Sequence, residues 1–188
     1  MTTGMIVALA VVGVLVLVAL WFMGIYNRLV SLKALVDEAW SGIDVQLKRR
    51  YDLIPNLVTT VKQYSTHEKE IFEKVAQMRA LAMGATSVAE KGHAEAGLSA
   101  ALKSLFAVVE NYPQLRANEN FMSLQKELSA IEHEIQLSRR YYNGAVRNYN
   151  IVVQSFPSSI IAGVAGFAKA QYFELGSASE RENPKVQF

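Results

Sequence analysis

The sequence predicts an all-α protein in which an N-terminal transmembrane helix is followed by an antiparallel four-helix bundle with long helices. Three observations lead to this fold class. Residues 5–24 are uncharged and apolar, the rest of the chain repeats apolar residues at steps of three and four, and no stretch alternates β-branched with polar residues as a half-buried strand would. Only Pro55 and Pro113 interrupt residues 27–156, so long helices are expected there.

The composition excludes several classes of protein. With 188 residues the chain has room for one domain and an additional segment. The absence of cysteine excludes disulfides, thiolate zinc sites, iron–sulfur clusters and cysteine nucleophiles. A formal net charge of +2 is too small to be the electrostatic footprint of a nucleic-acid-binding protein, so no nucleic-acid partner is expected.

The anchor is predicted over residues 5–26, after a short N-terminal tail of residues 1–4. Residues 5–24 would span roughly 30 Å as a helix, the thickness of a bilayer core. Trp21, Phe22 and Tyr26 follow at the edge where amphipathic rings favour the interface. A cleaved signal would need Lys or Arg before the apolar run and small residues at a cleavage site, and neither is present. The lipid bilayer is therefore the first expected partner.

The orientation of the anchor follows from its flanks. Arg28, Lys33 and residues 48–50 are basic and come after the span, whereas only the terminal amine carries positive charge before it. The positive-inside rule therefore places the N-terminus outside and the bundle in the cytoplasm.

The bundle is predicted over residues 27–156. A first helix, continuous with the anchor, is expected to end near Tyr51, where residues 48–50 would complement the negative end of its dipole. Asp52 is the expected N-cap of a second helix, with Pro55 in its first turn and Gly84 at its end.

The two remaining helices have clearer signals. Ser87 and Glu90 have the spacing of a capping box, which would begin a third helix that ends before Tyr112. The fourth is predicted over 118–156, because apolar and small residues follow a 3-4 alternation typical of a coiled coil from Phe121 to Phe156. The first and last helices would extend beyond the middle pair, and their projecting stripes would need a partner.

The segment 157–176 is apolar and rich in Gly and Ala but too short to span a membrane. Three placements are open: it folds back on the bundle, contacts another subunit, or lies in the membrane interface. Residues 177–188 are polar and are expected to be mobile.

No motif supports catalysis. Glu90 and His93 have the Glu-x-x-His spacing of di-iron bundles, but the second copy that such a site requires is missing. Residues 132–134, Glu-His-Glu, are expected on a solvated helix face, with a surface cation as the weaker interpretation. The sequence lacks a nucleophile elbow and a glycine-rich phosphate loop. We therefore predict no enzyme activity, no cofactor, no metal site and no catalytic residues.

Polar and small residues near the end of the last helix, and apolar residues of the tail, are the candidates for contacts with a partner. The polar members would either be core residues with satisfied side chains or form a seam for a partner helix. The candidate contacts are Ser138, Tyr142, Asn143, Tyr149, Asn150, Phe156, Ile160, Ile161, Gly163, Gly166, Phe167 and Phe173.

Several ordered motifs resemble the bacterial LemA family. They are residues 50–58 (RYDLIPNLV), 112–121 (YPQLRANENF), 124–128 (LQKEL), the Arg140, Tyr142 and Asn143 group, the pair Tyr149 and Asn150, 156–162 (FPSSIIA), 172–174 (YFE) and the closing 184–188 (PKVQF). Ile131, His133 and Arg116 depart from the family pattern. The match covers about residues 26–174.

The resemblance implies a single-pass protein of the bacterial cytoplasmic (inner) membrane with no established catalytic residues. It also implies a membrane zinc metalloprotease as a possible partner, because family genes often neighbour one. Two functions are open, and the projecting stripes and the apolar tail without a bundle partner motivate the first. The first is a self-associating scaffold, a homo-oligomer that organises or shapes a membrane patch, and the second is a monomeric adaptor that presents a groove to a membrane protease or a signalling protein.

Overall fold

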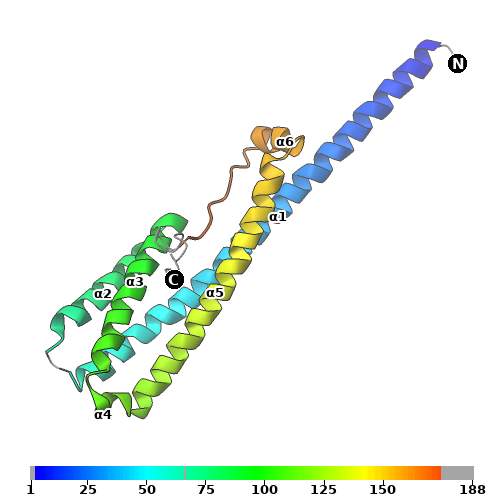
Figure 1. The fold of residues 1–188 in the computed structure, drawn as a ribbon. Helices are drawn as coiled ribbons and strands as arrows, with labels where there is room; N and C mark the ends of the chain where they lie inside the picture. The colour runs from blue at the N-terminus through cyan, green and yellow to red at the C-terminus, as the bar shows by residue number, and fades with distance from the viewer. Residues whose placement is uncertain (1–2, 66, 175–188) are drawn as a thin grey trace, which may run out of the picture. The chain divides into compact units, whose positions relative to one another are not determined.

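The computed structural model describes residues 3–65 and 67–174, and every regular element in this part of the chain is a helix. The helices are α1 (Thr3–Lys62), α2 (Lys69–Gly84), α3 (Val88–Val109), α4 (Pro113–Arg116), α5 (Glu119–Gln154) and α6 (Ser158–Val164) (Figure 1). The all-α prediction is confirmed for these residues. The predicted mobile segment 177–188 lies outside them.

The chain divides into two compact units. The anchor unit comprises Met1–Trp40 and Asn143–Ala170, and the bundle unit comprises Ser41–Tyr142 and Gln171–Phe188. The two long helices, α1 and α5, are each divided between the two units, with one segment in the anchor unit and one in the bundle unit.

The bundle unit is built from four helical segments: the last part of α1, then α2, α3 and the first part of α5. Figure 1 shows α2 and α3 side by side, joined by a short turn. Each segment buries one apolar stripe, as the 3-4 spacing predicts. The largest fully buried apolar side chains of the bundle unit include Ile43, Leu47, Ile54 and Leu57 on α1, Leu98 and Leu105 on α3, Leu115 on α4 and Ile131 on α5, and α2 buries Phe72, Val75 and Ala82. Burial of one such side chain stabilises the fold by about 1.5–3 kcal/mol, so these stripes hold the four segments together.

The predicted break between the first two bundle helices is wrong. Helix α1 continues past Tyr51 and through Pro55 to Lys62, and α2 begins only at Lys69. Proline has no amide hydrogen, so the carbonyl of Tyr51, four residues earlier, loses its normal helical donor. Arg79 of α2 replaces that donor, because its Nε donates to the Tyr51 oxygen at 2.7 Å.

The other predicted boundaries agree closely with the structure. Helix α2 ends at Gly84, and α3 begins after the predicted capping box, in which Ser87 Oγ accepts from the Glu90 amide and Glu90 Oε2 accepts from the Ser87 amide, both at 3.2 Å. The backbone amides of Ser87 and Thr86 hold the pKa of Glu90 below its usual value. Helix α5 begins at Glu119, where Asn118 Oδ1 accepts from the Phe121 amide at 3.0 Å.

The anchor unit contains the first part of α1, the end of α5, and α6. Helix α1 is long and apolar enough to cross a membrane, and the side chains of residues 5–23 are exposed. Beyond this stretch, the stripes that were expected to project without a partner are buried within the chain. The buried residues are Leu29, Val36 and Ala39 on α1, Val146, Tyr149, Val152 and Val153 on α5, and Ile161 and Ala162 on α6.

We predict that Arg79→Met lowers the free energy of unfolding by about 1–3 kcal/mol, because it leaves the buried Tyr51 carbonyl without a donor. Thermal unfolding of the full chain in mild detergent, followed by circular dichroism, measures this loss. Pro55→Ala is the matched second variant, since alanine supplies the missing amide. The double variant Arg79→Met/Pro55→Ala should recover part of the loss, and strictly additive effects would contradict the proposed replacement of donors.

Candidate functional site: the Arg50 network and its groove

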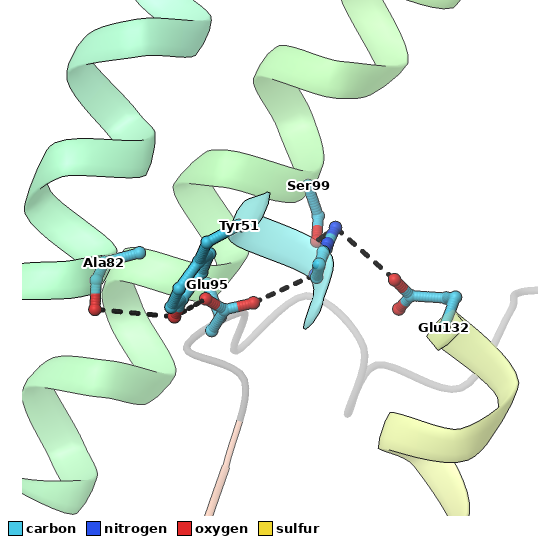
Figure 2. A network of polar contacts seen from close by, with 6 residues as sticks. Tyr51, Ala82, Glu95, Ser99 and Glu132 are labelled. Carbon is cyan, nitrogen blue, oxygen red and sulfur yellow. Dashed lines mark hydrogen bonds and ion pairs between the residues drawn. The ribbon is translucent and has the colours of Figure 1, made fainter. Parts of the chain in front are cut away.

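A buried polar network lies at the centre of the bundle unit (Figure 2). Arg50 of α1 donates from Nη1 to Glu95 Oε2 and from Nη2 to Ser99 Oγ, both at 2.9 Å. The same Nη2 lies 3.3 Å from Glu132 Oε2 on α5. Arg50 therefore connects α1 to α3 and to α5.

Tyr51 extends the network to α2. Its hydroxyl is hydrogen-bonded to the Glu95 carboxylate and lies 3.4 Å from the carbonyl oxygen of Ala82 (Figure 2). Together with the bond from Arg79 to the Tyr51 carbonyl, this joins α1 and α2 at two points. All four helical segments of the bundle unit thus meet at residues 50 and 51.

Burial controls the ionisation of this network. Glu95 is only 1% exposed, and its burial raises the pKa of its carboxyl, while the Tyr51 hydrogen bond and the Arg50 charge act in the opposite direction. Burial and the hydrogen bond to Glu95 raise the pKa of Tyr51 above its usual value near 10. Tyr51 therefore keeps its proton at physiological pH and remains a donor to Glu95.

The interpretation of residues 48–52 as a helix end is wrong for Arg50. Lys48 and Arg49 are exposed, but Arg50 is buried because α1 does not end here. The burial of Arg50 could have been predicted if the helix had been predicted to continue past Tyr51. In a continuous helix Arg50 belongs to a buried stripe with a 3-4 alternation, formed by Ile43, Leu47, Arg50, Ile54, Leu57 and Val61. Glu95 similarly begins the stripe Glu95, Leu98, Leu102, Leu105 and Val109 on α3.

The expectation for residues 132–134 also changes. Glu132 is half-buried and pairs with Arg50, whereas His133 and Glu134 are exposed. Within the described residues, no three His, Cys, Asp or Glu side chains gather in a cluster that could hold a metal ion. Glu90, the acidic member of the Glu-x-x-His spacing, serves as part of the α3 cap.

A groove of about 500 Å³ is lined by residues of α3 and α5 together with Arg50 of the network. Its apolar lining residues, Leu102 and Phe106 on α3 and Leu128 on α5, are called its walls below, and the network residues that line it, Arg50, Ser99 and Glu132, are called its base. Lys103, Gln125 and Ser129 complete the lining. A few apolar side chains with a polar tip would fit such a site, because the walls favour burial and the base offers hydrogen-bonding groups. Neither the groove nor its base was predicted from the sequence.

Residues 167–174 follow α6, form no helix or strand, and are called the strap below. In the bundle unit its last residues lie on α5 and α3. Tyr142 donates from its hydroxyl to the Gln171 carbonyl at 2.8 Å, and Phe173 is buried with the Arg139 guanidinium 5.6 Å from its ring centre. A Cβ atom on Gly92 would lie 2.2 Å from the carbonyl oxygen of Glu174, so only glycine fits beneath the end of the strap.

In the anchor unit the first residues of the strap are held by α5. Tyr149 donates to the Ala168 carbonyl at 2.9 Å. Asn150 donates to the Ala170 carbonyl and accepts from the Ala170 amide, both at 2.9 Å, which imitates the pairing of two strands. Burial raises the pKa of Tyr149, so its hydroxyl also stays protonated.

The remaining candidate contacts fall into two groups. Ser138 and Asn143 are half-buried and Ile161 is buried, whereas Phe156, Ile160, Gly163 and Gly166 are exposed. Gly166 has φ 77°, a left-handed conformation that ends α6 in a Schellman motif, in which the Phe167 amide donates to the Ala162 carbonyl at 2.9 Å. Phe167 then packs edge-on against Tyr26, with 5.7 Å between ring centres.

The structure therefore gives Tyr142, Tyr149, Asn150 and Phe173 partners within the same chain. Three placements were considered for the tail: on its own chain, on another subunit, or in the membrane interface. The strap packs on its own chain. A role in self-association is still a prediction for the exposed candidates. The strap itself could not be located from the sequence, because the side chains that hold it bind its main chain.

These features define an all-α protein in which an N-terminal helix of membrane-spanning length leads into a four-helix bundle. The family model for LemA matches residues 39–188, and the chain belongs to the LemA family. The resemblance found in the sequence is confirmed.

Similar proteins include magnetosome proteins and a protein named LemA. Magnetosome proteins MamQ 2 and MamQ 1 of Paramagnetospirillum magneticum are each 27% identical to the chain, over 94% of its length and 75% of theirs. Protein LemA of Metamycoplasma hominis is 27% identical, over 74% of the chain and 61% of its own length.

We predict that Arg50→Met destabilises the bundle by about 3–5 kcal/mol, because it leaves the Glu95 carboxylate buried without its cation. Thermal unfolding in mild detergent measures the loss. Arg50→Met/Glu95→Leu should recover most of it, since both buried charges are then removed and an apolar pair takes their place. If the double variant were no more stable than Arg50→Met alone, the ion pair would not be the source of the effect.

We also predict that Gly92→Ala displaces the end of the strap, because the new Cβ atom and the Glu174 carbonyl cannot share the same space. Hydrogen exchange of the peptide covering residues 171–174 should become faster, without loss of bundle helicity. Gly42→Ala is the matched control, since a Cβ atom there meets nothing within 4 Å. Exchange in this peptide as slow as in the control would show that the strap does not rest on Gly92.

Proposed function

We propose that the protein is a membrane-anchored, non-enzymatic scaffold whose copies bind one another and organise a patch of the bacterial inner membrane. The apolar first part of α1 serves as the anchor, with the N-terminus outside and the bundle in the cytoplasm, as the basic flank after the span favours. In this proposal the protein acts by binding through its bundle and catalyses no reaction.

One observation carries this proposal: the bundle unit has both an apolar groove and an exposed apolar pair. Leu137 and Tyr141 lie one turn apart on α5 and are 42% and 54% exposed. Tyr141 combines an apolar ring with a hydroxyl tip, which suits a groove with apolar walls and a polar base. The pair can thus fill the α3–α5 groove of another copy.

The geometry of α5 determines what kind of assembly results. Tyr141 follows the groove residue Glu132 by nine residues, which is about two and a half turns, so the two side chains leave opposite sides of the helix. A contact between two different surfaces is heterologous, and it continues from copy to copy unless the rotation closes a ring. Rows or rings of copies in the plane of the membrane are the expected product.

MamQ 1 and MamQ 2 are magnetosome proteins by name, and a scaffold role for this chain is compatible with that name. The Arg50 network supports a structural role for the buried charges, because Arg50 is bonded to both Glu95 and Ser99. The proposed role requires no reacting group.

The proposal is tested by the mass of the full chain extracted in mild detergent. We expect discrete assemblies larger than one copy, and monomers for Leu137→Glu/Tyr141→Glu, which removes the exposed pair, and for Ser129→Trp, which fills the groove. Val45→Glu is the matched control, because Val45 is an exposed apolar residue of the bundle unit away from both surfaces.

Mixing the two interface variants makes the test stricter. Each retains the surface that the other has lost, so a heterologous contact predicts a dimer from the mixture and no larger species. A monomeric native chain, or assemblies that survive both variants, would overturn the proposal.

A second candidate is a monomeric adaptor in which the same groove holds a segment of another membrane protein, such as a membrane zinc metalloprotease or a signalling protein. The groove itself favours this candidate, since its size suits a few inserted side chains. Cross-linking from Ser129→Cys in native membranes separates the two, because the chain has no other cysteine. Adducts between copies favour the scaffold, and one foreign adduct favours the adaptor.

A further inference from the structure

We propose that α6 is a second membrane contact: Phe156, Ile160 and Val164 insert into the surface of the bilayer beside the point where α1 leaves it. This inference goes beyond self-association but rests on the membrane anchoring proposed above. It concerns the anchor unit alone.

The first argument is the exposure of these three side chains. Phe156 is 82%, Ile160 60% and Val164 79% exposed, whereas Ile161 and Ala162 on the other side of α6 are buried. Ile160 and Val164 are four residues apart within α6, so they lie on a common side of this helix, and Phe156 is exposed just before it. An exposed apolar surface of this kind indicates a site of contact.

The second argument is the level at which α6 lies. The Phe167 ring, just after α6, packs against Tyr26 with 5.7 Å between ring centres. Tyr26 is the last residue of the predicted anchor, two residues and about 3 Å along α1 beyond the apolar run 5–24. The chain reversal at Gly166 keeps Phe167 next to the end of α6. Helix α6 is therefore held beside α1 at the interfacial end of the anchor (Figure 1).

The third argument is the distribution of charge. Residues 148–168 contain no charged side chain, and the exposed cations Arg147 and Lys169 flank this stretch on both sides. The exposed face of α6 can therefore enter the membrane interface without burying a charge, and Lys169 can extend its ammonium group to the phosphate level. These three observations favour the lipid surface over a protein partner as what contacts Phe156, Ile160 and Val164.

The experiment places a single spin label in the full chain, reconstituted into vesicles of phosphatidylcholine and phosphatidylglycerol. The native chain has no cysteine, so Ile160→Cys and Val164→Cys can each be labelled alone. We expect both labels to be more accessible to dissolved oxygen, which enters the bilayer, than to a water-soluble nickel complex. Asn148→Cys is the control in the same unit: it is exposed on α5, about 9 Å along the helix before Gln154.

The outcomes separate the patch from the anchor. Leu15→Cys reports on the anchor, because Leu15 lies in the middle of the predicted span. If Leu15→Cys is shielded from nickel while Ile160→Cys and Val164→Cys are as accessible to it as Asn148→Cys, the membrane contact of α6 is overturned and the anchor stands. Nickel access at Leu15→Cys would refute the anchor itself. Shielding at residues 15, 160 and 164, but not at 148, supports both.

Discussion

The ion pair between Arg50 and Glu95 is the constraint on which the bundle depends. A buried ion pair contributes little more to the free energy of folding than apolar packing of the same volume would. Separating Arg50 from Glu95, however, would leave a buried charge with neither water nor a counterion. The four helical segments must therefore align so that Arg50 meets Glu95 and Ser99, while Tyr51 reaches Glu95. Apolar stripes repeat from turn to turn, whereas the bonds of Arg50 to Glu95 and Ser99 form in the register seen here.

The same network forms the base of the α3–α5 groove. Arg50, Ser99 and Glu132 hold the helices together and also line the site where a partner would bind. A side chain that enters the groove meets polar groups whose positions are already fixed by the fold, so binding requires little reorganisation. The bundle and its proposed binding surface are thus one piece of structure, and a change at Arg50 would affect both.

The sequence predicted elements whose signals are local. The capping box at Ser87 and Glu90, the stop at Gly84 and the long stripe of α5 all involve residues within a few turns of one another. The predicted break at Asp52 failed because the group that replaces the missing amide of Pro55 is Arg79, on another helix. That error then concealed Arg50, whose place in an apolar stripe is visible only if α1 is continuous. The strap has no such local signal, because Tyr142, Tyr149 and Asn150 bind its main chain.

The continuity of α1 through Pro55 has a consequence for the order of folding. The membrane-spanning part of α1 can form as soon as it enters the bilayer, since every backbone group there is bonded within the helix. The turns around Pro55 lack one of these bonds until Arg79 is present. During synthesis from the N-terminus, those turns are completed only after most of α2 has emerged from the ribosome. The long helix is thus assembled in two stages, one directed by lipid and the other by its neighbour.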